Sequence, residues 1–404
     1  MKPTDVRKEE PEVWTMVEAF LKWARATDYE TYDWQDLWAT RVAGRAKAFY
    51  QGHRALGALA VAPFAAVDMT YPGCRRFFAK RRKHPISLAH LGLGHVHLYR
   101  TLQEAQELDA AIRFGDLLLA TATRTANGIG WGMKFRWHTI DGTIPEDTPC
   151  HTQTAYVYEL LAALHAETSD SAYETPLRKI ASHVCYDFPE WSFGEALASA
   201  YSTHDTRRVV NANSYRMMML LDAGRRFGIQ EYTDKGLATL EYVLSMQRED
   251  GSWPYSETED FVDTFHTCFV LKNLVKAQRI FGNGIERAKQ AVERGLAYYL
   301  SHLFDASGYP IPFSVRPRRT VYRYDSYDLA ESIGILAELE SESKRLRHLL
   351  RFVKTRLQTS DGWFRFRVYR RELGPGIPYM RWANSAMFVA LTKFLQLRAH
   401  DGSA

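Results

Sequence analysis

One short stretch of this sequence combines a tight turn, aromatic residues and several ionisable side chains. It runs from Gln247 to Thr267 and reads QREDGSWPYSETEDFVDTFHT. The Asp250-Gly251 pair signals a turn, because glycine adopts backbone angles that most residues avoid. A helix is expected to begin near residue 262, and its first turn carries Asp263 and His266. A carboxylate and an imidazole placed so closely can act as acid and base, so both are catalytic candidates.

Four other loops end in a similar mixture of side chains just before an apolar helix. Two further catalytic candidates, Tyr324 and Asp325, are expected to face the first pair. The candidates for contact with a substrate are Arg136, Trp137, Asp147, His151, Asn211, Asn213, Trp253, Tyr255, Glu257, Asp260, Arg381 and Trp382. Flat rings stack on sugar faces, amides and carboxylates bind hydroxyl groups, and arginine pairs with anionic oxygens. The combination therefore indicates a sugar-binding cleft, with Arg136 and Arg381 holding an anionic group and Trp137, Trp253 and Trp382 forming stacking walls.

Each of these residues also has a structural alternative. Asp, Asn, Ser and Thr at helix starts are usually caps, which would explain Asp147, Asn211 and Asp325. The three tryptophans that lie near a glycine could instead plug the floor of the fold; they are Trp131, Trp253 and Trp363. His266 could equally be a structural histidine. The reaction also stays open between hydrolysis, elimination and epimerisation.

The elements that must position these side chains are helices. Six apolar helices are expected, roughly 60 residues apart and each paired with a more polar helix. Their predicted starts lie near Ser87, Cys150, Asn211, Val262, Asp325 and Arg381. Two helices per unit at this period favour six hairpins closed into a ring, which is an all-α (α/α)6 toroid. We expect one domain over residues 1–404, in which residues 1–83 are a helical segment that completes the ring.

Charge and composition restrict the partners of the chain. The net charge is +5, and one basic cluster stands out, consisting of Arg75, Arg76, Lys80, Arg81, Arg82 and Lys83. This cluster is either a solvated helix face or a site for an anionic lipid or a polyanionic sugar. No nucleic-acid-binding motif accompanies it, so no nucleic acid partner is expected. The apolar run from Ala55 to Val67 is too short to span a bilayer, and contact with a membrane or a lipid-linked glycan is left open.

Cysteine usage and the first residues bear on the compartment. The four cysteines show no close pairing, and the sequence MKPTDVRKEE at the start lacks the apolar core of a signal peptide. The sequence therefore predicts a cytoplasmic protein with reduced thiols, with a peripheral location at the inner membrane left open. No cofactor and no metal are expected, and the oligomeric state is unknown.

The motif QREDGSW resembles the Q-x-x-D-G-x-W repeat of terpene cyclases. The motif DTFHTCFVLKNL is similar to an inner-helix segment of protein prenyltransferase β-subunits, in which the histidine is a zinc ligand. Both families are α/α toroids, so the resemblance implies that fold. The chain contains neither the D-x-D-D acid motif nor a D-x-C zinc-ligand pair, and Asp263, His266 and Cys268 alone do not make a metal site.

A larger part of the chain, most of residues 30–340, resembles bacterial exopolysaccharide or capsule biosynthesis proteins of the α/α-toroid type. The motifs that carry this resemblance are YDWQD, RRKHPISLAH, GWGMKFRW, TPCHTQTAYVYELL, VVNANSY, QREDGSWPY, DFVDTFHT and YRYDSYDLAESI. The resemblance implies a glycan context rather than one reaction. The arginine-rich final region, residues 316–323 and 363–381, departs from the pattern.

Three functional hypotheses follow from these observations. The first is an enzyme that acts on an acidic sugar or oligosaccharide during surface-polysaccharide synthesis. The second is a non-catalytic glycan-binding or scaffold protein, which would share the cleft but need no acid and base groups. The third is a prenyl or polyprenyl-lipid enzyme, which would need a continuous apolar tunnel and a bound metal. The first two differ in whether two ionisable groups lie within reach of one sugar-sized space.

Overall fold

The computed structural model describes residues 6–139, 142–317, 320–339, 343–369 and 376–401. Six inner helices touch one another in sequence order, and the last of them also touches the first, so they close a ring. They are α5 (Pro85–Leu102), α7 (His151–Thr168), α9 (Val210–Phe227), α11 (Thr264–Phe281), α13 (Ser326–Leu339) and α15 (Ser385–Asp401). A π-helical turn, η6 (Met380–Asn384), leads into α15. The six predicted helix starts are therefore confirmed.

Each inner helix lies against one outer helix. Five outer helices follow their inner partners in the chain, and the sixth, α2, lies against α15. They are α6 (Ala105–Ala120), α8 (Glu174–Tyr186), α10 (Gln230–Ser245), α12 (Glu286–His302), α14 (Lys344–Phe352) and α2 (Pro11–Ala26). The fold is an all-α (α/α)6 toroid, as the sequence predicts. The arrangement of α2 is the one expected if residues 1–83 complete the ring, and the extent of the domain stays a prediction.

Inner and outer helices alternate along the chain because they differ in the distribution of their apolar side chains. The inner helices bury residues on most sides, as in α9, where fourteen positions from Val210 to Gly224 are buried. The outer helices have one apolar stripe, as in α12, where six of seventeen residues are buried. An apolar stripe buries against one neighbour, whereas a helix that is apolar all round needs neighbours on every side. The ring satisfies both requirements.

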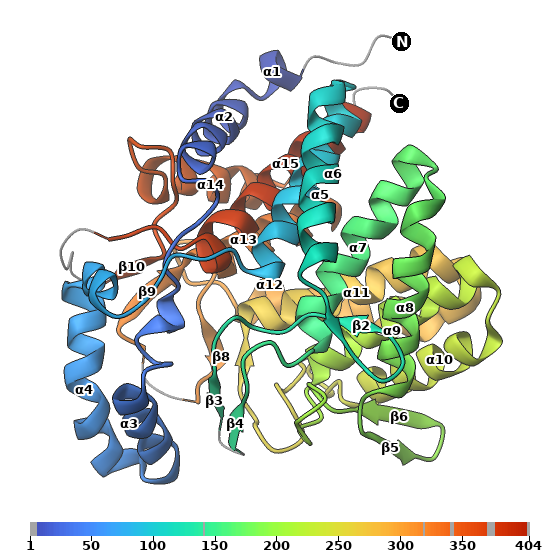
Figure 1. The fold of residues 1–404 in the computed structure, drawn as a ribbon, viewed down its shortest axis with the longest axis horizontal. Helices are drawn as coiled ribbons and strands as arrows, with labels where there is room; N and C mark the ends of the chain where they lie inside the picture. The colour runs from blue at the N-terminus through green and yellow to red at the C-terminus, as the bar shows by residue number, and fades with distance from the viewer. Residues whose placement is uncertain (1–5, 140–141, 318–319, 340–342, 370–375, 402–404) are drawn as a thin grey trace.

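Short antiparallel strand pairs occupy the loops at one end of the ring (Figure 1). Three pairs are local hairpins: β1 (Thr123–Arg124) with β2 (Ile129–Gly130), β3 (Trp137–Thr139) with β4 (Gly142–Ile144), and β5 (Glu190–Phe193) with β6 (Ala196–Ser199). Two pairs join successive loops: β7 (Val262–Asp263) with β8 (Phe313–Val315), and β9 (Tyr322–Asp325) with β10 (Arg367–Tyr369). The loops before the inner helices thus form one connected surface.

The Q-x-x-D-G motif holds one unit of the ring to the next. The Gln247 side chain donates to the carbonyls of Gly251, at 3.1 Å, and of Ala291 in α12, at 2.9 Å. Gln358 makes the same two bonds, to Gly362 at 3.1 Å and to Met16 in α2 at 2.8 Å. Both glycines have positive φ angles, 91° and 101°, and each lies against a backbone carbonyl where a Cβ atom would collide. The motif is therefore part of the fold.

A helical hairpin stands outside the ring. It consists of α3 (Arg41–Gly52) and α4 (Arg54–Thr70), which lie beside the β3 strand in Figure 1. The remaining short elements are α1 (Val6–Glu9), η1 (Trp34–Asp36), η2 (Pro72–Phe77), η3 (Ser171–Tyr173), η4 (Gly282–Ile285) and the π-helical η5 (Val353–Leu357). Within the described ranges, no helix has both the length and the apolar character needed to cross a membrane.

Candidate active site

A cavity of about 350 Å³ opens at the loop end of the ring. Eight of the sixteen predicted site residues line it: Trp137, Asn211, Tyr255, Asp263, His266, Asp325, Arg381 and Trp382. They come from five different loop-to-helix junctions, so residues far apart in the sequence converge on one space. The hairpin outside the ring adds Lys47, Tyr50, Gln51 and Arg54 to the lining.

Asp263 and His266 form a hydrogen-bonded pair in this cavity. Asp263 is the N-cap of α11, and one carboxylate oxygen accepts from the backbone N–H of His266 at 2.9 Å. The other oxygen lies 2.7 Å from Nδ1 of the His266 ring. Because that carboxylate holds the proton on Nδ1, the lone pair of Nε2 is available, and Nε2 has no hydrogen-bond partner among the described residues. An oriented imidazole with a free Nε2 can act as a general base.

Asp325 is held by groups from the next junction. One oxygen accepts from the indole N–H of Trp382 at 2.9 Å and from the backbone N–H of Tyr327 at 2.9 Å. The other accepts from Nε of Arg367 at 2.7 Å. With both oxygens occupied, Asp325 positions Trp382 and Arg367 in the cavity wall.

Asp328 is a third carboxyl group in the same lining and is absent from the predicted site. It is almost completely buried, and its Oδ1 has no hydrogen-bond partner. Burial raises its pKa well above the ordinary value, and the negative charges of Asp325 and Asp263 raise it further. The raised pKa favours the protonated form of Asp328, which can donate a proton. Asp328 follows Asp325, the last residue of β9, by three residues, and this spacing of about one helical turn was the available sequence signal.

Aromatic rings form much of the wall. Trp382 lies 4.8 Å from Tyr327 and 5.5 Å from Phe265, measured between ring centroids. In the loop that leads to α11, Tyr255 stacks on Phe261 at 4.6 Å and lies 4.8 Å from the ring of His266. Flat, largely apolar faces next to hydrogen-bonding groups suit a ligand with both C–H and O–H surfaces.

The arginines in the wall are held by carboxylates. Arg381 donates two hydrogen bonds to Asp33, at 2.7 and 2.8 Å. Burial alone would raise the pKa of Asp33, but the nearby charges of Arg381 and His84 lower it to about 2. Arg207 is paired in the same way with Asp205. These guanidinium groups are fixed in position, which favours binding of oxygen atoms in a defined direction.

Four predicted residues lie outside the lining of this cavity: the buried Tyr324 and the exposed Glu257, Asp260 and Arg136. The Tyr324 hydroxyl donates to Asp305 at 2.6 Å, in a separate outer cavity, while its neighbour Tyr322 lines the central one. Glu257 accepts from Arg208 and Asp260 accepts from Arg248, both outside the lining. Arg136 is exposed. A regular strand would place Tyr322 and Tyr324 on the same face, but the register shifts between Val368 and Tyr369, which leaves Arg323 unpaired and breaks the alternation.

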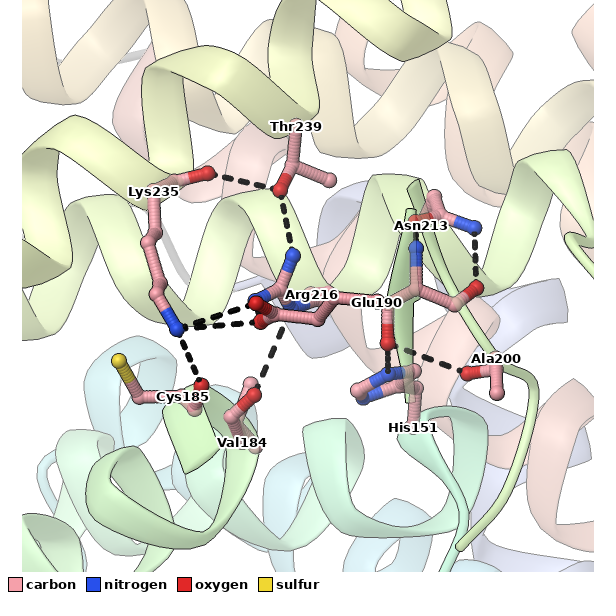
Figure 2. A network of polar contacts seen from close by, with 10 residues as sticks. His151, Val184, Cys185, Glu190, Ala200, Asn213, Arg216, Lys235 and Thr239 are labelled. Carbon is pink, nitrogen blue, oxygen red and sulfur yellow. Dashed lines mark hydrogen bonds and ion pairs between the residues drawn. The ribbon is translucent and has the colours of Figure 1, made fainter. Parts of the chain in front are cut away.

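The other four predicted residues hold the scaffold together. His151 Nε2 lies 2.9 Å from the Ser199 hydroxyl, and its ring stacks on Phe188 at 3.8 Å. Asn213 accepts from the Ser199 backbone N–H at 2.7 Å and donates to the Ser199 carbonyl at 3.0 Å. Both side chains thus reach the end of the β6 strand (Figure 2). Trp253 is buried and donates to the Val243 carbonyl at 3.0 Å, and Asp147 pairs with Lys134 at 2.6 Å.

Figure 2 also places a buried arginine beside this strand pair. Arg216 of α9 is completely buried and pairs with Glu190, and it donates to the Thr239 hydroxyl at 2.9 Å. Lys235 shares the same carboxylate at 3.2 Å. These contacts tie α9, α10 and β5 together away from the cavity. Among the residues that the structure describes, no group of three or more His, Cys, Asp or Glu is arranged to hold a metal ion.

The chain is an (α/α)6 toroid whose central cavity is lined by ionisable and aromatic side chains. The sequence matches no family model and no curated protein. Solved structures do match. A cellobiose 2-epimerase from Bacillus thermoamylovorans B4167 has a TM-score of 0.63 and 11% identity, covering 78% of this chain and 88% of the other. A family 88 glycosyl hydrolase from Bacteroides vulgatus has a TM-score of 0.53 and 11% identity, covering 83% and 98%.

A third match is a GH76 α-mannanase from Bacteroides thetaiotaomicron, with a TM-score of 0.57 and 9% identity, covering 80% of this chain and 87% of the other. At such low sequence identities the similarity establishes the fold alone. Both sequence resemblances implied an α/α toroid, and that implication is confirmed. The terpene cyclase and polysaccharide-biosynthesis parts of those resemblances gain no support from these structures.

Proposed function

We propose that this chain is an enzyme that transfers a proton to or from a sugar. The observation that carries the proposal is the His266–Asp263 pair, whose free Nε2 faces a cavity of sugar size. His266 acts as the base, and Asp263 orients its ring and stabilises the imidazolium that forms. The structural neighbours support this proposal, since they include an epimerase, a glycosyl hydrolase and an α-mannanase.

Asp328 is the proposed proton donor. A base alone does not complete an epimerisation, an elimination or a hydrolysis, because each also needs a proton delivered to the substrate or the leaving group. Asp328 lines the same cavity as His266, and its raised pKa keeps the proton on the carboxyl group. When two titratable groups in one site have different surroundings, their pKa values move apart, so one can act as the acid and the other as the base.

The two alternative hypotheses fit the cavity less well. A glycan-binding protein without catalysis needs the aromatic walls but has no use for an oriented imidazole beside a protonated carboxyl group. A prenyl-lipid enzyme needs an apolar tunnel, whereas this lining includes Arg207, Arg367, Arg381 and three aspartates. The presence of two ionisable groups in one sugar-sized space favours the enzyme.

The proposed substrate is an acidic sugar or oligosaccharide. Three wall arginines pair with aspartates. Lys47 and Arg54 also line the cavity, and their positive charges support an anionic substrate. A role in surface-polysaccharide synthesis in the cytoplasm is the proposed context, and it rests on the sequence resemblance. Neutral sugars are the competing substrate class.

The test is product analysis on the full chain. Uronate-containing and neutral oligosaccharides are incubated with the protein in D₂O and followed by NMR. Deuterium on a ring carbon without cleavage identifies an epimerase, a new reducing end a hydrolase, and an unsaturated ring a lyase. His266→Gln is expected to lose turnover, whereas His204→Gln, at an exposed site outside the cavity, retains it. Equal turnover in both variants would contradict the proposal.

A further inference from the structure

The α4 helix is apolar on nearly all sides and yet almost uncovered. Its sequence is RALGALAVAPFAAVDMT, and Gly57 is the one buried residue among its seventeen. Gly57 lies directly against Tyr50 of α3, so the small residue serves the contact between the two helices. Leu56 is 63% exposed and Leu59 is 73% exposed. Exposed apolar surface of this extent marks an interaction site.

The net positive charge of the chain comes from the same region. Residues 41–83 contain ten Lys and Arg and one acidic residue, Asp68, which gives a net charge of +9. Because the whole chain carries +5, the other residues together carry −4. Asp68 is itself paired with the buried Arg75. The net positive charge of the chain is therefore concentrated in the segment that contains the exposed helix, and the other residues together are net negative.

Basic and aromatic side chains flank the apolar helix at both ends. Before it, the Arg54 guanidinium lies 5.0 Å from the centroid of the Tyr50 ring. After it, in η2, Arg76 lies 4.7 Å from the ring of Phe77, which is 72% exposed. Apolar groups bordered by aromatic and cationic groups match the layers of a lipid surface, where acyl chains lie beneath charged headgroups.

We propose that α3, α4 and η2 form a docking surface for an anionic lipid bilayer. The apolar side chains of α4 would enter the outer acyl layer, and the exposed basic residues of 41–83 would contact lipid phosphates; they are Arg41, Arg45, Arg54, Arg76, Lys80 and Arg81. A second copy of the chain fits this surface poorly, because a two-fold interface would bring two regions of charge +9 together. The helix lies on the bilayer rather than across it, consistent with its length.

Docking in this way also orients the cavity. Lys47, Tyr50, Gln51 and Arg54 belong to the hairpin and line the cavity mouth. A bilayer that holds α4 therefore lies close to the mouth. The docking proposal does not depend on the reaction, because it concerns binding of the protein to lipid and is measured without a substrate.

The first test is flotation of the full chain with lipid vesicles. Vesicles made of equal parts of phosphatidylglycerol and phosphatidylcholine are compared with vesicles of phosphatidylcholine alone, and binding to the anionic vesicles is expected to be at least roughly tenfold stronger. The double variant Leu56→Glu with Leu59→Glu is expected to lose this binding. A matched control, Leu117→Glu with Phe193→Glu, changes two exposed apolar residues elsewhere and is expected to bind like the original chain.

The second test concerns charge. Arg76→Glu with Arg81→Glu is expected to weaken binding by at least roughly tenfold, whereas Lys179→Glu with Lys289→Glu, on outer helices, is not. Higher salt should weaken binding of the original chain. Equal binding to both vesicle types, or an unchanged α4 variant, would overturn the proposal. So would a dimer that dissociates in the α4 variant without any lipid binding, because a second copy would then cover the helix.

Discussion

Two histidines at equivalent junctions of the ring have opposite environments. His151 begins α7 and is completely enclosed, with its ring stacked on Phe188 and bonded to Ser199. Burial lowers its pKa well below the ordinary value. His266, in the first turn of α11, is oriented by a carboxylate and lines the cavity with a free Nε2. The same residue type thus supports the scaffold in one repeat and offers a reactive atom in another.

The difference arises from the position within the first helical turn. His151 is the first residue of α7, whereas His266 is the third residue of α11. Since each residue advances about 100° around a helix, two positions differ by about 200°. The third residue of α7, Gln153, does line the cavity. The second and third residues of both helices, Thr152 and Gln153 in α7 and Phe265 and His266 in α11, line the cavity, whereas the first residue of α7 lies outside the lining.

The largest effect is expected from removing the cavity histidine. His266→Ala should lower kcat/KM by about 10³-fold, within the range for loss of a general base, once a substrate is known. The thermal unfolding midpoint should change little, because the ring is partly exposed and His266 keeps its backbone bond to Asp263. Steady-state kinetics and calorimetry measure the two effects. A loss of stability without a loss of turnover would make His266 a second structural histidine.

The opposite result is expected for the enclosed histidine. His151→Ala should lower the free energy of unfolding by about 3 kcal/mol, because it leaves a cavity and removes the hydrogen bond between the imidazole and the Ser199 hydroxyl. Turnover per folded molecule should be unchanged. The folded pKa of His151 is lowered, so its contribution is complete above the unfolded value near 6.5 and is lost as the pH falls below it. Urea unfolding at pH 7.5 and 5.5 should therefore give a smaller difference at the lower pH.

A third comparison concerns the buried acid. Asp328→Asn keeps the size of the side chain but removes the transferable proton, so kcat should fall by about 10²-fold. The fold should remain intact, because the raised pKa of Asp328 favours a neutral carboxyl group, which the neutral amide of asparagine replaces. A pH–rate profile measures the effect: the original chain should lose activity at high pH as Asp328 ionises, and the variant should lack that limb. An unchanged high-pH limb would exclude Asp328 as the donor.

The fold could be predicted from the sequence because the inner helices differ so clearly from the outer ones. A helix such as α9, buried on most sides, and a helix such as α12, with one apolar stripe, give distinct patterns. The hairpin of α3 and α4 was harder, since an apolar run such as residues 55–67 is typical of a buried segment. Its exposure depends on the absence of a covering element, which local sequence does not encode.

The sequence could predict which loop-to-helix junctions form the candidate site, but not which side chains at each junction line the cavity. Asp263, His266, Asp325 and Trp382 lie together, whereas Asn213 and Trp253 make backbone contacts that stabilise the turns. The choice depends on which face of a helix points to the axis. Asp328 was missed because its significance depends on burial beside two other carboxylates, and burial is a property of the closed ring.

The smallest effect is expected at an enclosed acid that resembles Asp328 in its pKa but lies outside the cavity lining. Asp36 accepts from the Asp33 backbone N–H at 2.7 Å. Burial, together with the negative charge of Asp33, raises its pKa from 3.8 to about 6. Above pH 6 the folded protein holds an ionised Asp36 at a cost that the unfolded chain does not have. Asp36→Asn should therefore increase the free energy of unfolding by about 2 kcal/mol at pH 7.5.

The gain should disappear near pH 4, where Asp36 is protonated in the folded protein. Asp33→Asn is the matched control with the opposite sign. Its folded pKa is lowered to about 2, so its contribution is complete above pH 4 and is lost as the pH falls toward 2. This variant should destabilise the fold at pH 7.5, because it also breaks the paired bonds to Arg381. Urea unfolding of both variants at pH 7.5 and 4 measures the signs. If Asp36→Asn were also destabilising at pH 7.5, Arg75 and Arg82 would stabilise the ionised form of Asp36 more strongly than burial opposes it. Asp328, for which Arg367 is the cation that lowers the pKa, would then be the one of these two enclosed acids whose pKa is dominated by burial.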